Sequence, residues 1–151
     1  MKSYLGVKIL MAEPKTLGDY SVLRGWTIPD NEDPDREGYL VQYPDGYEIW
    51  SPKEAFESAY LPLENPTKIT PSEIDTFVLP SEDSQLDEKT TLVKINTVTG
   101  FVQYEVSSCV DPANYDHALG VELASKRIKD RLWPMLGFVL QWGMRGLKYK
   151  Q

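Results

Sequence analysis

The strongest strand pattern in the sequence lies in two runs just past the middle of the chain. Residues 90–97 and 101–107 are rich in Val, Ile, Thr and Tyr, and Thr99-Gly100 stands between them. Two such runs joined by a short turn with glycine are typical of a β-hairpin. We therefore predict an antiparallel strand pair over these residues.

The first third of the chain has weaker strand patterns. Residues 1–12 alternate loosely between apolar and polar positions, which predicts a strand. Residues 38–50 hold two β-prone runs on either side of Asp45-Gly46. Because an Asp-Gly pair supplies the positive φ that a tight turn needs, this segment predicts a second hairpin.

A short helix, a connector and a loop are predicted next. Residues 51–54, Ser-Pro-Lys-Glu, combine an N-cap serine, a proline at the first helical position and a glutamate that completes a capping box. This helix is expected to end near Tyr60. Prolines at positions 62, 66 and 71 mark a connector, residues 74–79 predict a short strand, and residues 81–89 predict a solvated loop.

The C-terminal third has a helical period. Asp111 can cap a helix and Pro112 can occupy its first turn, so a helix is predicted up to about Trp133. Pro134 should interrupt it, which predicts a second helix over residues 134–143. On a helical wheel one stripe is apolar and should be buried; it consists of Val121, Ala124, Ile128 and Leu132.

Strands followed by helices are typical of an α+β fold. We predict one domain over residues 1–151, in which a mainly antiparallel β-sheet with one short helix precedes two C-terminal α-helices. Its parts are an N-terminal β-rich module (1–62), a connector and loop (63–90), and a hairpin plus helices (91–151).

Composition narrows the possible partners. The formal net charge of −7 would repel the backbone of DNA or RNA, so we expect no polymeric nucleic-acid partner. A small nucleotide needs only a local basic pocket. The single cysteine, Cys109, fits a reducing cytosol. We expect no membrane partner and no signal peptide, because no apolar run approaches about 20 residues and Lys8 and Glu13 interrupt the N-terminal segment.

Two arginines are the strongest candidates for chemistry. Arg127 and Arg131 lie one helical turn apart, beside the apolar stripe, with Asp116 and Gly120 on the same flank. Paired guanidiniums can grip a small anion, Gly120 leaves space over that face, and Asp116 could accept a hydrogen bond from a ribose hydroxyl. The alternative is an ordinary solvated pair, neutralised by Asp116 or Asp130.

Other residues offer weaker signals. Phe101 could stack on a base or pack in the sheet, and packing is the better interpretation for Tyr104. His117 is interpreted as a plain helix-surface residue. The Arg-Gly-Trp segment at 24–26 could grip a phosphate or a base, although packing of the tryptophan is favoured. We find no catalytic or metal-binding motif, so we expect no enzyme activity, no cofactor and no metal.

The C-terminal segment resembles a family of small tailed-phage proteins. The resemblance rests on a Val-rich hairpin strand at Val102–Val106, a Cys-Val-Asp-Pro-x-Asn-Tyr-Asp motif at Cys109–Asp116, and a Trp-Pro-x-x-Gly-Phe turn at Trp133–Phe138. It covers about the last 60 residues. Within this group the chain is similar to the Thoeris anti-defence protein 1 family.

The resemblance implies a function and an assembly. Members of that family are phage sponges that bind glycocyclic ADP-ribose without cleaving it, and some also bind cyclic oligonucleotides at a separate site. They form homodimers or hexamers with the signal at a subunit interface. By this resemblance we expect the protein in the cytoplasm of the infected bacterial host, with a sheet followed by two helices.

The resemblance also implies ligand-binding residues. Arg127 and Arg131 match the family's arginine pair for phosphates, and Phe101 matches its stacking aromatic. Asn114 matches its asparagine near the helix start, although Asp111 is an alternative at that place. The competing hypothesis is a small phage structural or interaction protein without a nucleotide ligand. It would use exposed aromatic residues and a basic tail, which contains Arg145, Lys148 and Lys150.

Overall fold

The computed structural model describes residues 1–149. The chain forms two compact units: residues 1–62 together with the end of the chain from Trp142, and residues 63–141. Both helices and antiparallel sheets are present, so the predicted α+β class is confirmed. The division into one domain with three parts stays a prediction. Lys150 of the predicted basic tail lies outside the described residues.

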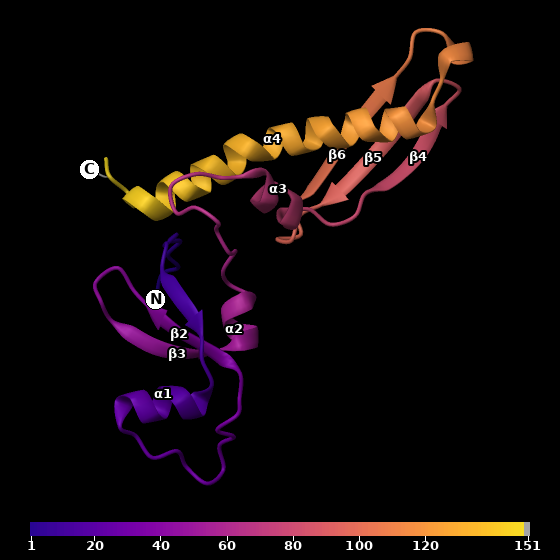
Figure 1. Ribbon diagram of the computed structural model, residues 1–151. Coiled ribbons are helices and arrows are strands. Elements are labelled where there is room, and N and C mark those ends of the chain that lie inside the picture. Colours follow the sequence, from indigo (N-terminus) through magenta and orange to yellow (C-terminus); the bar gives the residue numbers. More distant parts are fainter. Residues whose placement is uncertain (150–151) are drawn as a thin grey trace. The chain divides into compact units, whose positions relative to one another are not determined.

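The first unit contains a three-stranded antiparallel sheet. Its strands follow the order β1 (Met11–Pro14), β2 (Gly38–Gln42) and β3 (Glu48–Pro52), as Figure 1 shows. The predicted hairpin at β2 and β3 is confirmed, and Gly46 supplies a φ of 85° in its turn. Two short helices accompany the sheet, α1 (Leu17–Arg24) and α2 (Lys53–Glu57).

The strand predicted at the start of this unit is wrong, and one helix was not predicted. Most of the predicted strand over residues 1–12 has no regular structure, and pairing begins only at Met11. The sequence interpretation also missed α1. Thr16 caps this helix by accepting a hydrogen bond from the Asp19 N–H (3.1 Å), and Gly25 ends it in the left-handed region at a φ of 68°.

The predicted start of α2 is also wrong. Ser51 pairs with Tyr39 inside the sheet, so its side chain does not cap the helix. The residue before α2 is Pro52, and α2 ends at Glu57 instead of near Tyr60. Strand pairing therefore took precedence over the local capping signal.

The second unit is a sheet with a long helix on one face (Figure 1). The antiparallel strands follow the order β4 (Glu82–Asp87), β5 (Thr90–Asn96) and β6 (Val102–Ser108), which confirms the predicted hairpin at β5 and β6. Helix α3 (Pro71–Phe77) precedes the sheet, and the short 3-10 helix η1 (Pro112–Asn114) follows it. Helix α4 (His117–Arg145) comes last.

The connector over residues 63–90 holds more structure than predicted. Residues 74–79 were predicted as a strand, but most of them belong to α3, which begins with a capping box between Thr70 and Glu73. Residues 81–89 were predicted as a solvated loop, but they contain β4. The charged side chains of β4 are exposed because the strand lies at the edge of the sheet.

The predicted break at Pro134 is wrong. One continuous helix, α4, passes through this proline, so there are not two C-terminal helices. A proline in a helix costs about 3 kcal/mol. Leu132 and Leu136, on either side of it, are both buried, and their packing offsets this cost. Asp111 acts as a cap, as predicted, but for η1 and not for α4.

The apolar stripe of α4 forms the core of the second unit. Ala124 and Ile128 are fully buried against Val93 and Ile95 of β5, and Leu132 packs with Ile74 and Leu136. Val121 is partly buried against the same cluster, so the predicted buried stripe is confirmed. Within residues 1–149, no helix has the length and apolar character needed to cross a membrane.

Candidate functional site

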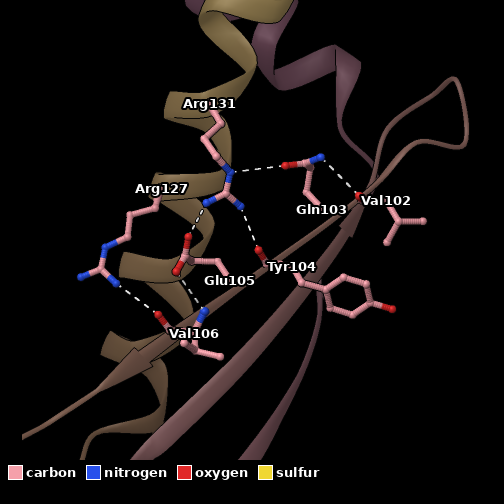
Figure 2. A network of polar contacts seen from close by, with 7 residues as sticks. All are labelled: Val102, Gln103, Tyr104, Glu105, Val106, Arg127 and Arg131. Atoms are coloured by element: carbon pink, nitrogen blue, oxygen red, sulfur yellow. Dashed lines mark hydrogen bonds and ion pairs between the residues drawn. The ribbon is translucent and has the colours of Figure 1, made fainter.

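The two arginines predicted to bind an anion lie beside an edge of the sheet. Because Arg127 and Arg131 are one turn apart, their side chains leave α4 on the same flank. That flank faces β6, an edge strand whose outer backbone groups have no neighbouring strand. Figure 2 shows both guanidiniums directed at this strand.

The arginines bind the backbone of β6. Arg131 donates from Nη2 to the Tyr104 carbonyl (2.9 Å), and Arg127 donates from Nη1 to the Val106 carbonyl (3.1 Å). The carbonyl of Val102 accepts from Gln103 Nε2 (3.2 Å). Three successive outward carbonyls of β6 are therefore bonded to side chains, which is one way in which proteins protect a sheet edge.

Glu105 supplies the counter-charge of the site. Its carboxylate accepts a hydrogen bond from Arg131 Nη1 and a second from the Val106 N–H (3.2 Å), and Gln103 Oε1 accepts from Arg131 Nε (3.3 Å). The hydrogen bond from Arg131 holds the pKa of Glu105 below its usual range. The carboxylate therefore stays ionised at neutral pH, and the three charged groups sum to one positive charge.

Three other predicted site residues gather at the start of α4. Asp111 Oδ1 accepts from the Ala113 N–H (2.9 Å), and Asp116 Oδ1 accepts from the Leu119 N–H (3.0 Å). Asn114 is the last residue of η1. Eleven positions separate Asp116 from Arg127, about 16 Å along a helix. The six predicted residues therefore do not converge on one spot within a single chain.

Phe101 lies at the turn between β5 and β6. Gly100 has a φ of 81° there, and the Phe101 carbonyl accepts from the Thr97 N–H (2.9 Å). The side chain is 57% exposed. In the part of the chain that the structure describes, no ring contact of Phe101 is found, so a stacking role stays a prediction.

The expected open space at Gly120 is wrong. Gly120 does not leave room for a ligand, because a Cβ atom there would lie 2.5 Å from Thr91 Oγ1. Arg24 was the other candidate for gripping a phosphate. It ends α1 and donates to Tyr20 Oη (3.2 Å) and to the Glu48 carbonyl (3.1 Å).

Sequence reasoning missed a hydrogen-bonded cluster around His117. The imidazole Nε2 lies 2.6 Å from Asp83 Oδ1 of β4, and Nδ1 lies 2.8 Å from Tyr115 Oη. Tyr115 Oη is in turn 2.8 Å from Thr91 Oγ1 of β5. His117 is therefore not a plain surface residue, and the cluster connects the first turn of α4 to two strands. Nothing in the local sequence pairs His117 with Asp83, which lies 34 positions away.

Replacing His117 with alanine should lower the free energy of unfolding by about 1 kcal/mol, the usual net value of a lost hydrogen-bond partner. Urea unfolding followed by circular dichroism measures this. Glu122→Ala is the matched control, because Glu122 is exposed on the same helix and surface substitutions usually change stability by less than about 0.5 kcal/mol. Equal effects of the two substitutions would contradict a stabilising cluster.

An apolar hollow adjoins Arg131. It is a shallow, open depression on one face of α4 and is lined by Arg131, Pro134, Met135, Phe138 and Val139. One side of α4 thus presents the positive charge of the arginines next to an apolar surface. Within residues 1–149, no cluster of three or more His, Cys, Asp or Glu side chains is arranged to hold a metal ion.

The comparisons with known proteins identify a family. The model of a phage protein family, N4 Gp49/phage Sf6 gene 66, matches residues 62–144, which is more than half of the chain. The chain belongs to this family. The part that matches the N4 Gp49/phage Sf6 gene 66 family contains the whole arginine network and the His117 cluster.

The family match confirms the expected relation to phage proteins. Its description mentions no ligand, so the nucleotide ligand stays a prediction. Searches of curated proteins and of solved structures found no match.

Proposed function

We propose that this phage protein binds a small cyclic nucleotide signal, glycocyclic ADP-ribose in the first instance, and sequesters it without cleavage, which would block Thoeris-type immunity. The observation that carries the proposal is the arginine pair on one exposed flank of α4, next to an apolar hollow. A dinucleotide-like ligand has the matching chemistry, because it joins phosphates to flat, largely apolar bases.

The arginines keep donors for a phosphate. Among the described residues, hydrogen bonds occupy one N–H of Arg127 and three of Arg131. A guanidinium has more donors than these, and Arg127 is exposed. Arg127 is therefore the better first contact. Arg131, held in place by Glu105, would contribute a fixed second charge.

The hollow beside Arg131 suits a base. Met135 and Val139 present apolar atoms about one and two turns further along α4. Base stacking against protein side chains contributes about 1–3 kcal/mol per base where it has been measured. A ligand with its phosphates at the arginines and a base at this hollow would use both kinds of contact.

The proposal includes a homodimer or a hexamer. Asp111, Asn114 and Asp116 lie too far along the chain from the arginine pair to share one small ligand within a protomer. A second copy would have to bring such residues to the site. Binding at a subunit interface would also bury the exposed guanidinium of Arg127, which strengthens its contact with a phosphate.

Arg127→Ala should weaken ligand binding at least tenfold, because a charge-assisted hydrogen bond contributes about 1.5–3 kcal/mol. Calorimetric titration with glycocyclic ADP-ribose isomers and a panel of cyclic di- and trinucleotides measures this. Lys126→Ala is the matched control, because Lys126 is adjacent and exposed and pairs only with Asp130 among the described residues. The control should bind like the unmodified protein.

The same samples separate sequestration from catalysis. After titration the protein is heat-denatured and the released ligand is analysed. Recovery of intact ligand supports a sponge, and altered ligand indicates an enzyme. Absence of binding to every compound contradicts the proposal.

The second candidate function is a protein-interaction role. It is favoured by the face of the sheet opposite α4, where Val102, Tyr104 and Val106 of β6 are exposed. An apolar row on a sheet face is typical of protein contact sites. Under this hypothesis Arg127→Ala would leave the biological effect of the protein unchanged.

A further inference from the structure

The two edges of the second unit's sheet differ. At β6 the outward carbonyls of Val102, Tyr104 and Val106 are bonded to side chains. A further strand at β6 would have to displace both arginines. The sheet therefore has one protected edge, and the other edge is β4.

The strand register shows which backbone groups of β4 point outward. The backbone N–H and C=O groups of Tyr104 and Val106 in β6 point away from β5. The backbone groups of their partners on β5, Lys94 and Leu92, therefore point toward β4. In an antiparallel ladder the bonded and non-bonded pairs alternate. Asp83 and Gln85 therefore direct their N–H and C=O groups away from the sheet. Among residues 1–149, no hydrogen bond to these outward groups is found.

The open edge is acidic. All six residues of β4 are exposed, and they include Glu82, Asp83 and Asp87. Lys94 on the neighbouring strand pairs with Glu82 (3.2 Å), and His117 pairs with Asp83. Asp87 has its pKa held below the usual range by hydrogen bonds from the Lys89 N–H and the Thr90 hydroxyl. The edge therefore favours a strand that brings positive charge.

The start of the chain has the complementary character. Residues 1–10 make no strand pair within the described part of the chain. They contain Lys2 and Lys8, and the first acidic residue is Glu13. Tyr4 and Leu5 are 90% and 78% exposed. A basic segment with exposed apolar side chains and no strand partner among the described residues is thus available for pairing.

Residues 7–9 anchor the end of the segment, where Lys8 Nζ also lies 5.5 Å from the centroid of the Tyr43 ring. A Cβ atom at Gly143 would lie 3.1 Å from Ile9 and 3.5 Å from Val7, so these two side chains pack beside α4 where it ends. Residues 1–6 precede this anchor and are all exposed. When extended they reach about 20 Å, which is longer than the outward-facing part of β4.

We propose that residues 1–6 of one copy add as a strand to the β4 edge of a second copy. The backbone groups of Asp83 and Gln85 supply up to four hydrogen bonds, and Lys2 of the added strand lies near the acidic side chains. Strand addition of this kind uses backbone bonds for affinity and side chains for specificity. The contact goes beyond the proposed ligand binding and does not depend on it.

Crosslinking between two differently tagged proteins tests the proposal. Both carry Cys109→Ser, which removes the natural thiol. One carries a cysteine at position 2, 3, 4 or 5, tested one at a time, and the other carries Gln85→Cys. A short bismaleimide joins thiols on adjacent strands, which are about 5 Å apart. In this mixture a crosslink between the two tags is necessarily intermolecular.

The blocked edge provides the matched control. Tyr104→Cys on β6 replaces Gln85→Cys, because Tyr104 is also exposed on an edge strand. We expect at least tenfold more crosslinked product at position 85 than at position 104 for one or more arm positions. Lys2→Glu in the arm protein should reduce that product, and 1 M salt should do the same by screening the charges.

Three results would overturn the proposal. The first is equal crosslinking at both edges, which indicates random collision. The second is absence of product at position 85 for every arm position. The third comes from an additional protein that carries both the arm cysteine and Gln85→Cys: a crosslink within this chain, with none between the two tags in the mixture, would show that the arm folds back on its own copy.

Discussion

Replacing Ile128 with alanine should lower the free energy of unfolding by about 3–4 kcal/mol. Ile128 is fully buried between α4 and β5, where it packs with Val93, Ile95 and Ala124. The substitution removes buried methyl groups and leaves a cavity that a helix packed on a sheet cannot close fully. Urea unfolding followed by far-ultraviolet circular dichroism measures the loss, because α4 is the longest helix among the described residues.

The control for this prediction lies on the same helix. Leu123 is 38% exposed, so Leu123→Ala removes methyl groups without a closed cavity and should cost about 1 kcal/mol. If the two variants lost the same stability, Ile128 would not be the centre of the core. The slope of the urea dependence should not change in either variant.

Glu73→Ala should lower the free energy of unfolding by about 3 kcal/mol. Glu73 is 2% exposed, and its carboxylate accepts hydrogen bonds from the Glu64 N–H (2.6 Å), the Thr70 N–H (2.7 Å) and the Thr70 hydroxyl. The substitution leaves these donors without an acceptor and removes the cap of α3. Asp75→Ala on the same helix loses only a surface ion pair with Lys129, so it should cost less than about 1 kcal/mol.

The same carboxylate makes stability depend on pH. Hydrogen bonds to the carboxylate lower the pKa of Glu73 from 4.5 to about 2, and the bond from the Thr70 hydroxyl has the largest effect. Because the folded-state pKa is depressed, the stabilisation is complete above pH 4.5 and is lost as the pH falls toward 2. Glu73→Gln should flatten the pH dependence in this window. An unchanged profile in that variant would show that other carboxylates cause the acid sensitivity.

Much of the fold could be predicted because local pattern and tertiary packing agree there. The hairpin of β5 and β6 combines β-branched residues with a glycine turn, and the stripe containing Ala124, Ile128 and Leu132 has a helical period. The failures arise where a distant contact decides. Pro134 stays helical because leucines on either side of it are buried, and β4 is a strand because β5 offers it a partner.

The candidate site shows the same limit. The sequence placed Arg127 and Arg131 together on one flank of a helix, and the structure does so. It did not predict that the polar side of β6 would face this helix. In β6 the polar residues Gln103 and Glu105 alternate with apolar and aromatic ones. Such alternation usually predicts that the apolar side of the strand faces the core. Two arginines beside a buried stripe need hydrogen-bond acceptors. That requirement was the one feature of the sequence from which a contact with the Glu105 carboxylate could have been predicted.

The arginine-covered edge of β6 has a consequence for growth into larger polymers. Fibrils form when each new strand leaves a fresh edge for the next. In this sheet one edge is already bonded to side chains, so further strands can be added only at the other edge. Edge-to-edge growth of this sheet is therefore confined to one direction, because a strand that joined at β6 would have to break the arginine contacts.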